Sequence, residues 1–108
     1  MRRAQAKRRR PKTADLDARW SAAVRAPCRC SKCGKVRALH AHHVIHRRFR
    51  RWRWVIGNGV ALCADCHRWA HDNPLAFRQW IWKAFPMATL DLHAACPEAN
   101  LRKGMDDA

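Results

Sequence analysis

Acidic residues and long apolar runs are the two features that this sequence has least of. Asp and Glu number 8 against 23 Lys and Arg, so the 108 residues carry a formal net charge of +15. No apolar stretch approaches the ~18 residues that a membrane helix requires, so we expect no contact with a membrane. The N-terminus has no apolar segment of the kind found in signal peptides, and we therefore expect a cytoplasmic protein.

The positive charge is concentrated in two Arg-rich segments, residues 2–12 and residues 46–54. We expect residues 1–13 to form a basic disordered arm, because they show no apolar periodicity. A field of this strength attracts polyanions, and nucleic acid is the most common partner. The second segment supplies the predicted phosphate contacts: Arg47, Arg48, Arg50, Arg51 and Arg53. Two tryptophans in this segment, Trp52 and Trp54, can stack on bases or pack beneath the chain, and the sequence favours neither.

Four of the six cysteines form two Cys-x-x-Cys pairs, Cys30 with Cys33 and Cys63 with Cys66. In a reducing compartment such pairs indicate metal ligands before disulfides, and four thiolates complete the tetrahedron that Zn²⁺ takes in structural sites. A short chain buries a small core, so its folding would depend on this ion. The remaining two cysteines are interpreted differently. Cys28 competes with Cys30 as the partner of Cys33, although spacing favours Cys30, and Cys96 is expected to be a bystander.

Seven histidines are present, and five polar residues form an ordered series along the chain: His42, His43, Asn58, His67 and His71. Adjacent residues of a strand point to opposite faces, so one of His42 and His43 can ligate a divalent ion while its neighbour acts as a general base. His67 and His71 are four residues apart on a predicted helix and would complete that metal site. The amide of Asn58 can bond to backbone across the intervening segment and orient the base. The other histidines are interpreted as surface residues: His40, His46 and His93.

The expected elements place these motifs on a small framework. We predict helices over residues 14–26, 64–72 and 75–85, β-prone segments over 36–45 and 60–62, a tight turn over 28–35, and a long loop for the Arg/Trp segment. The helix over 75–85 carries an apolar stripe that we expect to pack in the core. Residues 87–108 are expected to form a C-terminal tail.

With these residues in order, the sequence resembles the HNH endonucleases that carry a four-cysteine zinc site. Ala-His-His-Val-Ile at 41–45, Asn-Gly-Val-Ala-Leu-Cys-Ala-Asp-Cys-His at 58–67, and His71 carry the resemblance, which covers about residues 28–73. It implies a small α+β protein with a ββα-metal, treble-clef-like core. A four-cysteine zinc site would stabilise this core, helices would flank it, and the domain would cover residues 14–86. The loop departs from the family pattern, because it is Arg/Trp-rich where a Gly-Gly turn is common. The short Arg-rich chain and the helix after Asn73-Pro74 also look similar to small phage-encoded HNH proteins.

The resemblance implies cleavage of DNA with one divalent ion, Mg²⁺ or Mn²⁺, with Zn²⁺ or Ni²⁺ as further options, in a bacterial or phage-infected cell. By motif position, His42 and His67 correspond to metal ligands, His43 to the general base and Asn58 to the residue that orients the base. His71 corresponds to a third ligand found in some members. The four cysteines, Cys30, Cys33, Cys63 and Cys66, correspond to the structural zinc ligands.

Two other functions remain open at this stage. One is a non-catalytic, zinc-stabilised module that only binds nucleic acid, and it would have no use for the histidine series. The other is an accessory subunit of a phage DNA-processing or packaging complex, in which cutting requires phage or host partner proteins. RNA also stays open as a substrate.

Overall fold

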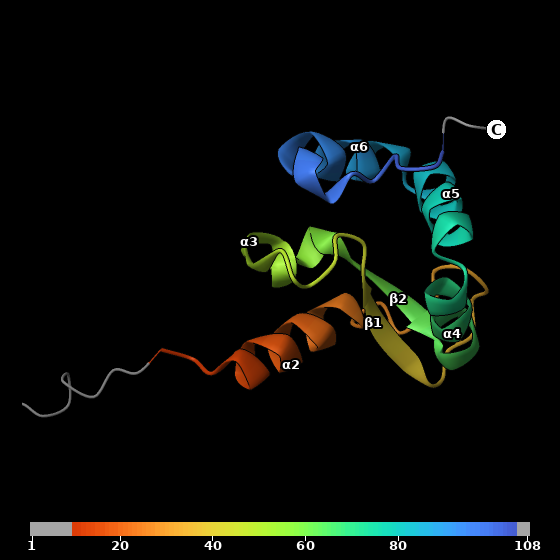
Figure 1. Ribbon diagram of the computed structural model, residues 1–108. Helices are drawn as coiled ribbons and strands as arrows, with labels where there is room; N and C mark the ends of the chain where they lie inside the picture. The colour runs from red at the N-terminus through yellow and green to blue at the C-terminus, as the bar shows by residue number, and fades with distance from the viewer. Residues whose placement is uncertain (1–9, 106–108) are drawn as a thin grey trace, which may run out of the picture.

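Two antiparallel strands followed by a helix form the centre of the molecule. The computed structural model describes residues 10–105. Strand β1 (Leu39–His43) pairs with β2 (Gly59–Cys63), with Leu39 opposite Cys63 and His43 opposite Gly59. Helix α4 (Ala64–Asp72) begins directly after β2 (Figure 1). The predicted small α+β, ββα arrangement is therefore confirmed. Residues 1–9, most of the predicted basic arm, lie outside the described part of the chain.

Helices cover both faces of the two-stranded sheet. On one face, Val60 and Leu62 of β2 are buried against α4 and α5 (Pro74–Ala84) in the first hydrophobic core. On the other face lies α2 (Thr13–Val24), whose buried Trp20 and Val24 are four residues apart and so share one side of the helix. Figure 1 shows α2 and α4 on opposite sides of the strands. Helix α2 ends two residues earlier than the predicted range of 14–26.

The segment between the strands is more ordered than the long loop that the sequence suggested. It contains one turn of helix, α3 (Arg50–Arg53), and a 3-10 turn, η1 (Ile56–Asn58). Local backbone bonds hold these turns, including Trp52 N–H to the Phe49 carbonyl at 2.9 Å. The backbone carbonyl of Asn58 also accepts from Val44 N–H at 3.0 Å, so the strand ladder continues past the end of β1.

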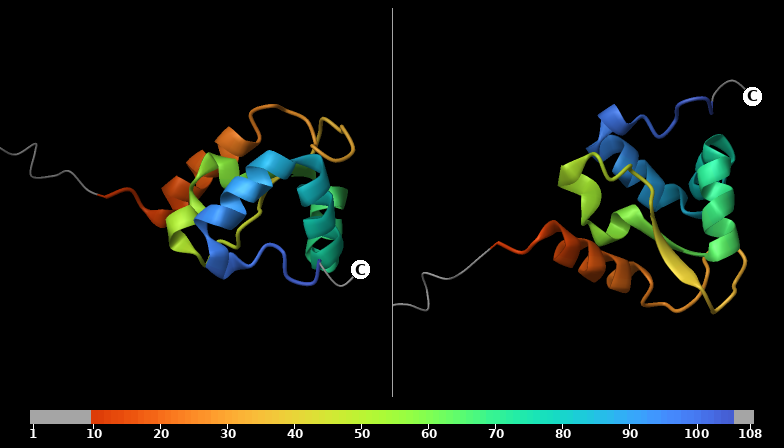
Figure 2. Two further views of the ribbon diagram at one scale, coloured as in Figure 1. Left: turned by 90° about the horizontal axis from the view of Figure 1, so that it is seen from above. Right: turned by 60° about the horizontal axis from the view of Figure 1, so that its bottom comes forward.

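Residues 87–105, which the sequence suggested would form a tail, instead build a second core. Pro86 does stop α5, as predicted, but it also occupies the first turn of α6 (Pro86–Ala95), where its missing N–H costs nothing. A 3-10 turn, η2 (Pro97–Ala99), follows. Leu92, Cys96 and Leu101 bury Ile45, which lies two residues after β1, so α6 folds back toward the inter-strand segment (Figure 2). Among residues 10–105, no helix combines the length and apolar character needed to cross a membrane.

Candidate functional site

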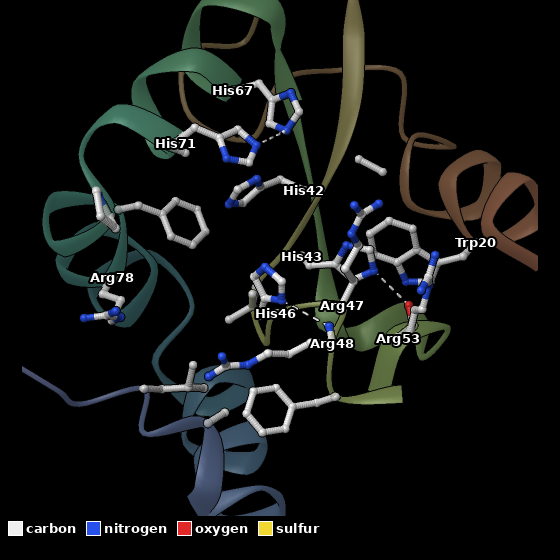
Figure 3. Close-up of a pocket in the computed structure, with 18 of the residues that line it drawn as sticks. Trp20, His42, His43, His46, Arg47, Arg48, Arg53, His67, His71 and Arg78 are labelled. Atoms are coloured by element: carbon white, nitrogen blue, oxygen red, sulfur yellow. Dashed lines mark hydrogen bonds between the residues drawn. The ribbon is translucent and has the colours of Figure 1, made fainter. Parts of the chain in front are cut away.

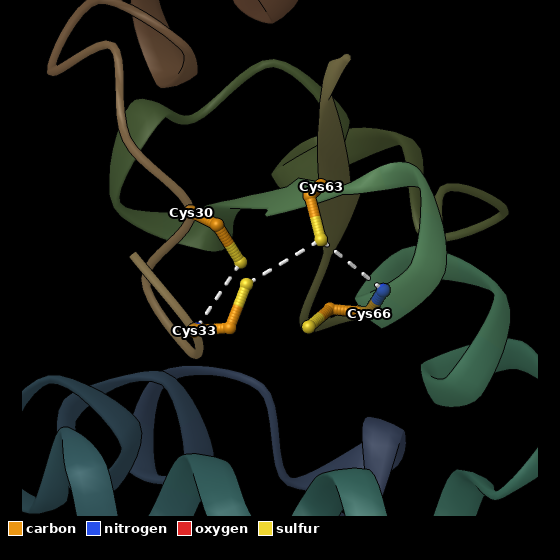
Figure 4. Close-up of side chains that lie close together, drawn as sticks. All are labelled: Cys30, Cys33, Cys63 and Cys66. Carbon is orange, nitrogen blue, oxygen red and sulfur yellow. Dashed lines mark hydrogen bonds between the residues drawn. The ribbon is translucent and has the colours of Figure 1, made fainter. Parts of the chain in front are cut away.

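Four thiols from the turn before β1, the end of β2 and the start of α4 converge on one point (Figure 4). All four sulfur atoms lie within 4.8 Å of one another, and Cys33 Sγ is 3.6 Å from Cys63 Sγ. The cluster has these members: Cys30, Cys33, Cys63 and Cys66. This arrangement suits the tetrahedral coordination of a zinc ion. The exposed Cys28 points its thiol at the Ala26 carbonyl, 3.2 Å away, so the structure resolves the choice between Cys28 and Cys30 in favour of Cys30.

Backbone N–H groups near this cluster stabilise the thiolate form of Cys30. Gly34, in the left-handed region at φ +83°, lets the chain turn tightly, and Cys33 N–H donates to Cys30 Sγ at 3.5 Å. Burial opposes ionisation of the Cys30 thiol, but the surrounding N–H groups outweigh it and lower its pKa to about 6. Burial and the neighbouring thiols raise the pKa of Cys66. A full set of four thiolates therefore needs a bound cation to balance its charge, as a zinc site provides.

A second cluster consists of three imidazoles, contributed by β1 and α4: His42, His67 and His71 (Figure 3). Their ligand nitrogens lie within 4.8 Å of one another, and the Nε2 atoms of His67 and His71 are 3.1 Å apart. Burial, followed by the neighbouring histidines, lowers the pKa of His42 to about 3, and burial is also the main cause of the lowered pKa of His67. Neutral imidazoles that face one point can hold a divalent cation and leave its other positions to water or substrate.

His40 is exposed, as the sequence suggested, and it also contacts His67 of this cluster. It lies two residues before His42 and so on the same face of β1. Its Nδ1 is 3.2 Å from Nδ1 of His67, whose Nε2 faces His71. Metal-binding histidines commonly hydrogen-bond through the ring nitrogen that does not bind the ion. The period-two spacing of His40 and His42 was the sequence signal that could have identified this residue.

His43 lies on the other face of β1. Its Nε2 is 2.9 Å from the Arg53 carbonyl oxygen. Because a carbonyl can only accept, Nε2 carries the proton and Nδ1 is left as an acceptor. The ring of Trp20 stacks on the imidazole at a centroid distance of 3.8 Å. Burial is the main cause of a lowered pKa for His43, so the ring is neutral at neutral pH and able to take up a proton.

Asn58 is fully buried at the base of the inter-strand segment. Its Oδ1 accepts from Ile45 N–H at 2.5 Å, and its Nδ2 donates to the carbonyls of Ile45 and Trp52, both at 3.0 Å. One side chain thus ties together the two sides of the segment. Trp52 directly precedes Arg53, whose carbonyl meets His43, so Asn58 fixes the backbone partner of the imidazole without touching the ring.

A cleft of about 810 Å³ is lined by His43, by the cluster of three imidazoles and by four arginines. Arg47 and Arg48 come from the segment after β1, and Arg78 comes from α5, where its Nη1 donates to the Lys103 carbonyl at 2.9 Å (Figure 3). Arg78 carried no sequence signal, because it stands alone on a helix. The cleft therefore places positive charge around the histidines, as an anionic substrate requires.

The other arginines of the predicted phosphate-binding set have different surroundings. Arg53 also lines the cleft, but its guanidinium is already paired with Asp17 of α2 through two hydrogen bonds, at 2.9 and 2.7 Å. Arg50 and Arg51 are exposed, outside the residues that line the cleft. Their guanidinium groups lie 5.2 Å from the Trp54 ring centre and 5.8 Å from that of Trp52, respectively.

The question of Trp52 and Trp54 is resolved in favour of packing. Trp54 donates its indole N–H to Asp17 at 2.8 Å, and Trp52 packs half-buried against the second core.

Comparison with known proteins identifies one segment of the chain. Residues 29–73 match the family model described as HNH endonuclease. This segment contains β1, the inter-strand segment, β2, α4, both ligand clusters, His43 and Asn58, whereas Trp20, Asp17 and Arg78 lie outside it. Searches of curated proteins and of solved structures found no match to the chain.

Proposed function

We propose that this chain, whose residues 29–73 carry an HNH endonuclease domain, is a metal-dependent endonuclease that hydrolyses phosphodiester bonds of DNA. An HNH endonuclease domain implies a nucleic-acid substrate. One observation carries the proposal of catalysis. A neutral His43 and the cluster of three imidazoles lie on either side of β1, yet line the same positively charged cleft. A module that only binds nucleic acid has no need for this arrangement.

The protein groups would divide the reaction between them. A divalent ion such as Mg²⁺ or Mn²⁺, held by His42, His67 and His71, would neutralise charge on the scissile phosphate and the leaving oxygen. Nδ1 of His43 would take the proton of the attacking water, because Nε2 keeps its own proton toward the Arg53 carbonyl.

Substrate binding would depend on arginines from two walls of the cleft. Arg47 and Arg48 would contact phosphates from the side of the inter-strand segment, and Arg78 would contact them from α5. Such contacts position the nucleic acid without reading its sequence. Arg50 and Arg51 would extend the positive surface beyond the cleft.

The four-cysteine cluster would hold a structural zinc ion, apart from the reaction. It joins the turn before β1 to the junction of β2 and α4, and His67 directly follows the ligand Cys66. The zinc ion would thereby fix the start of the helix that carries two of the catalytic metal ligands, His67 and His71.

Plasmid cleavage tests the proposal, with purified wild type, His43→Ala and the matched control His93→Ala. His93 lies on α6, outside the residues that line the cleft. We expect wild type and His93→Ala to cut with Mg²⁺ or Mn²⁺ and not with EDTA. Loss of the base should lower the rate of His43→Ala by at least about 100-fold. Zinc content and circular dichroism are measured on each sample.

Two outcomes would contradict the proposal. If wild type binds DNA but cuts neither DNA nor RNA with any of these metals, the isolated chain is a binding module or a subunit that requires a phage or host partner. If His43→Ala cuts as fast as wild type, the reaction uses another base.

A further inference from the structure

We infer that Trp20 is a positioning residue for His43, and that its indole holds the imidazole in one orientation. This inference rests on the proposed function, in which His43 is the general base. Trp20 belongs to α2, outside the segment that matches the HNH family model. The positioning role of Trp20 therefore comes from a helix that lies outside the matched HNH segment.

The two rings form a close, nearly parallel stack. The interplanar angle between Trp20 and His43 is 7° and the distance between the ring centroids is 3.8 Å. Most aromatic pairs in proteins are offset or edge-to-face, with centroids about 4.5–7 Å apart. The indole face is therefore close enough to His43 to oppose tilting of the imidazole ring.

The indole cannot readily leave this position. Trp20 is only 5% exposed, and its Nε1–H donates to the Val55 carbonyl at 2.8 Å. Val55 lies two residues after Arg53, whose carbonyl meets His43. The backbone of the inter-strand segment therefore holds both the indole of Trp20 and the imidazole on which it stacks.

Strand β2 provides the space for the stack. Gly59 pairs with His43 across the sheet. A Cβ atom at Gly59 would lie 2.7 Å from Cζ2 of Trp20 and 2.3 Å from Cγ2 of Val24, too close for any side chain. The strand residue opposite His43 thus has no side chain, and the indole occupies the space beside it.

A second residue of α2 supports the same imidazole from its edge. Asp17 lies three residues before Trp20 and binds the guanidinium of Arg53 through both carboxylate oxygens. Since the Arg53 carbonyl accepts from His43, α2 acts on the ring face through Trp20 and on the ring edge through Asp17. One helix thereby controls both contacts of the imidazole.

The test compares Trp20→Leu and Trp20→Phe with the control Trp82→Leu in the full chain. Trp82 is half-buried, and like Trp20 it donates its indole N–H to a carbonyl (Leu101, 2.9 Å) and contacts a histidine, His93, which lies away from the cleft. We expect Trp20→Leu to lower kcat about 30-fold, because the imidazole is then free to leave the orientation in which it acts as a base. KM and the affinity for Mn²⁺ should stay within about twofold, because the indole stacks on His43, which is not one of the three metal ligands. Trp20→Phe keeps an aromatic face against the imidazole, and its kcat should fall by less than about fivefold.

A second experiment remains informative if Trp20→Leu alters folding. In His43→Gly, free imidazole should restore part of the cleavage, because it can enter the vacated space and stack on Trp20. The double variant with Trp20→Leu should show no such rescue. Equal rescue in both backgrounds, or a kcat for Trp20→Leu equal to that of Trp82→Leu, would overturn the inference while the proposed function stands.

Nuclear magnetic resonance of the His43 ring protons separates the two possible failures. Stacking should shift these resonances upfield in wild type, and the shift should disappear in Trp20→Leu. A wild type that cuts no nucleic acid refutes the proposed function, and the positioning role of Trp20 in catalysis fails with it, even if the upfield shift shows that the rings stack. Cleavage without the upfield shift refutes only the stack.

Discussion

The sulfur of Cys63 accepts a hydrogen bond from the backbone N–H of Cys66 at 3.5 Å, so Cys63, a residue of the sulfur cluster, also caps the helix that carries His67. Helix starts leave several N–H groups without partners, and an acceptor at the cap position satisfies one of them. The sulfur cluster and the imidazole cluster are therefore joined through the first turn of α4.

We expect Cys66→Ser to abolish zinc binding and to lower the free energy of unfolding by more than about 4 kcal/mol, as is usual when a structural metal is lost. Affinity for Mn²⁺ should fall in the same variant, since the start of α4 is no longer fixed. Zinc analysis and urea unfolding measure both effects. Cys28→Ser is the control, and because Cys28 is exposed its stability should change by less than about 0.5 kcal/mol. Zinc retained at full content in Cys66→Ser would contradict this assignment.

Replacing His40 tests whether the neighbour of His67 supports metal binding. His40→Ala removes the group 3.2 Å from Nδ1 of His67, and we expect Mn²⁺ affinity to fall about tenfold, as for other residues that orient metal ligands. His40→Asn retains a hydrogen-bonding side chain and should recover part of the loss. Calorimetric titration with Mn²⁺ measures the affinity. Unchanged affinity in His40→Ala would show that the contact has no role in metal binding.

Acidification should destabilise the protein without a divalent ion at its histidines. Burial lowers the pKa of His42 from 6.5 to about 3, so the folded state keeps this ring neutral while the unfolded state takes up a proton. The contribution of neutral His42 to the free energy of unfolding is complete above pH 6.5 and is lost as the pH falls from there toward 3. Urea unfolding of wild type and His42→Gln between these limits isolates the effect, because loss of zinc at low pH is common to both. We expect the free energy of unfolding to change less with pH in His42→Gln than in wild type. Equal changes in the two proteins would contradict this prediction.

Substitution of two arginines should separate substrate binding from support of the base. Arg47→Ala should weaken DNA binding, raise KM and reduce the salt dependence of binding by about one phosphate contact. Arg53→Ala removes the partner of Asp17 and should lower kcat and stability more than binding, because its side chain is already engaged. Filter binding across a salt series and steady-state kinetics measure these effects. A larger binding defect in Arg53→Ala than in Arg47→Ala would reverse the two roles.

Removing the amide of Asn58 should affect both folding and rate. Asn58→Ala leaves buried backbone groups of Ile45 and Trp52 without partners, at a cost of about 3 kcal/mol. We also expect a lower kcat, because the Arg53 carbonyl loses its support. Asn73→Ala is the control, since its exposed amide makes one bond to the Trp69 carbonyl. Unfolding by urea and single-turnover cleavage test the two effects separately.

The motifs predicted the two ligand clusters because metal ligands must converge wherever the chain runs between them. The Cys-x-x-Cys spacing needs only two tight turns, and the histidines follow from strand alternation and one turn of helix. Contacts made across long stretches of sequence left no such signal. Asp17 and Arg53 are 36 residues apart, and nothing in the sequence distinguishes this arginine from its exposed neighbours.

Helix α6 was missed for a different reason. Its apolar residues are spread around the helix and form no stripe, and Pro86 was interpreted only as the end of α5. The burial of Leu92 and Cys96 against Ile45 decides its packing, and that contact depends on the tertiary fold. Local patterns therefore predicted α2 and the ββα centre, and lost accuracy after α5.

The contacts by which the inter-strand segment supports His43 use mainly its backbone. Asn58 bonds to the backbone of Ile45 and Trp52, and the imidazole meets the carbonyl of Arg53, so the side chains at Arg47 and Arg48 take no part in holding the base. Substitutions at Arg47 and Arg48 during evolution could therefore change which nucleic acids are bound, and with what affinity, without changing the residues that carry out cleavage. For protein engineers, the same separation marks the first residues of this segment, around Arg47 and Arg48, as positions where nucleic-acid affinity can be changed without altering the cutting centre.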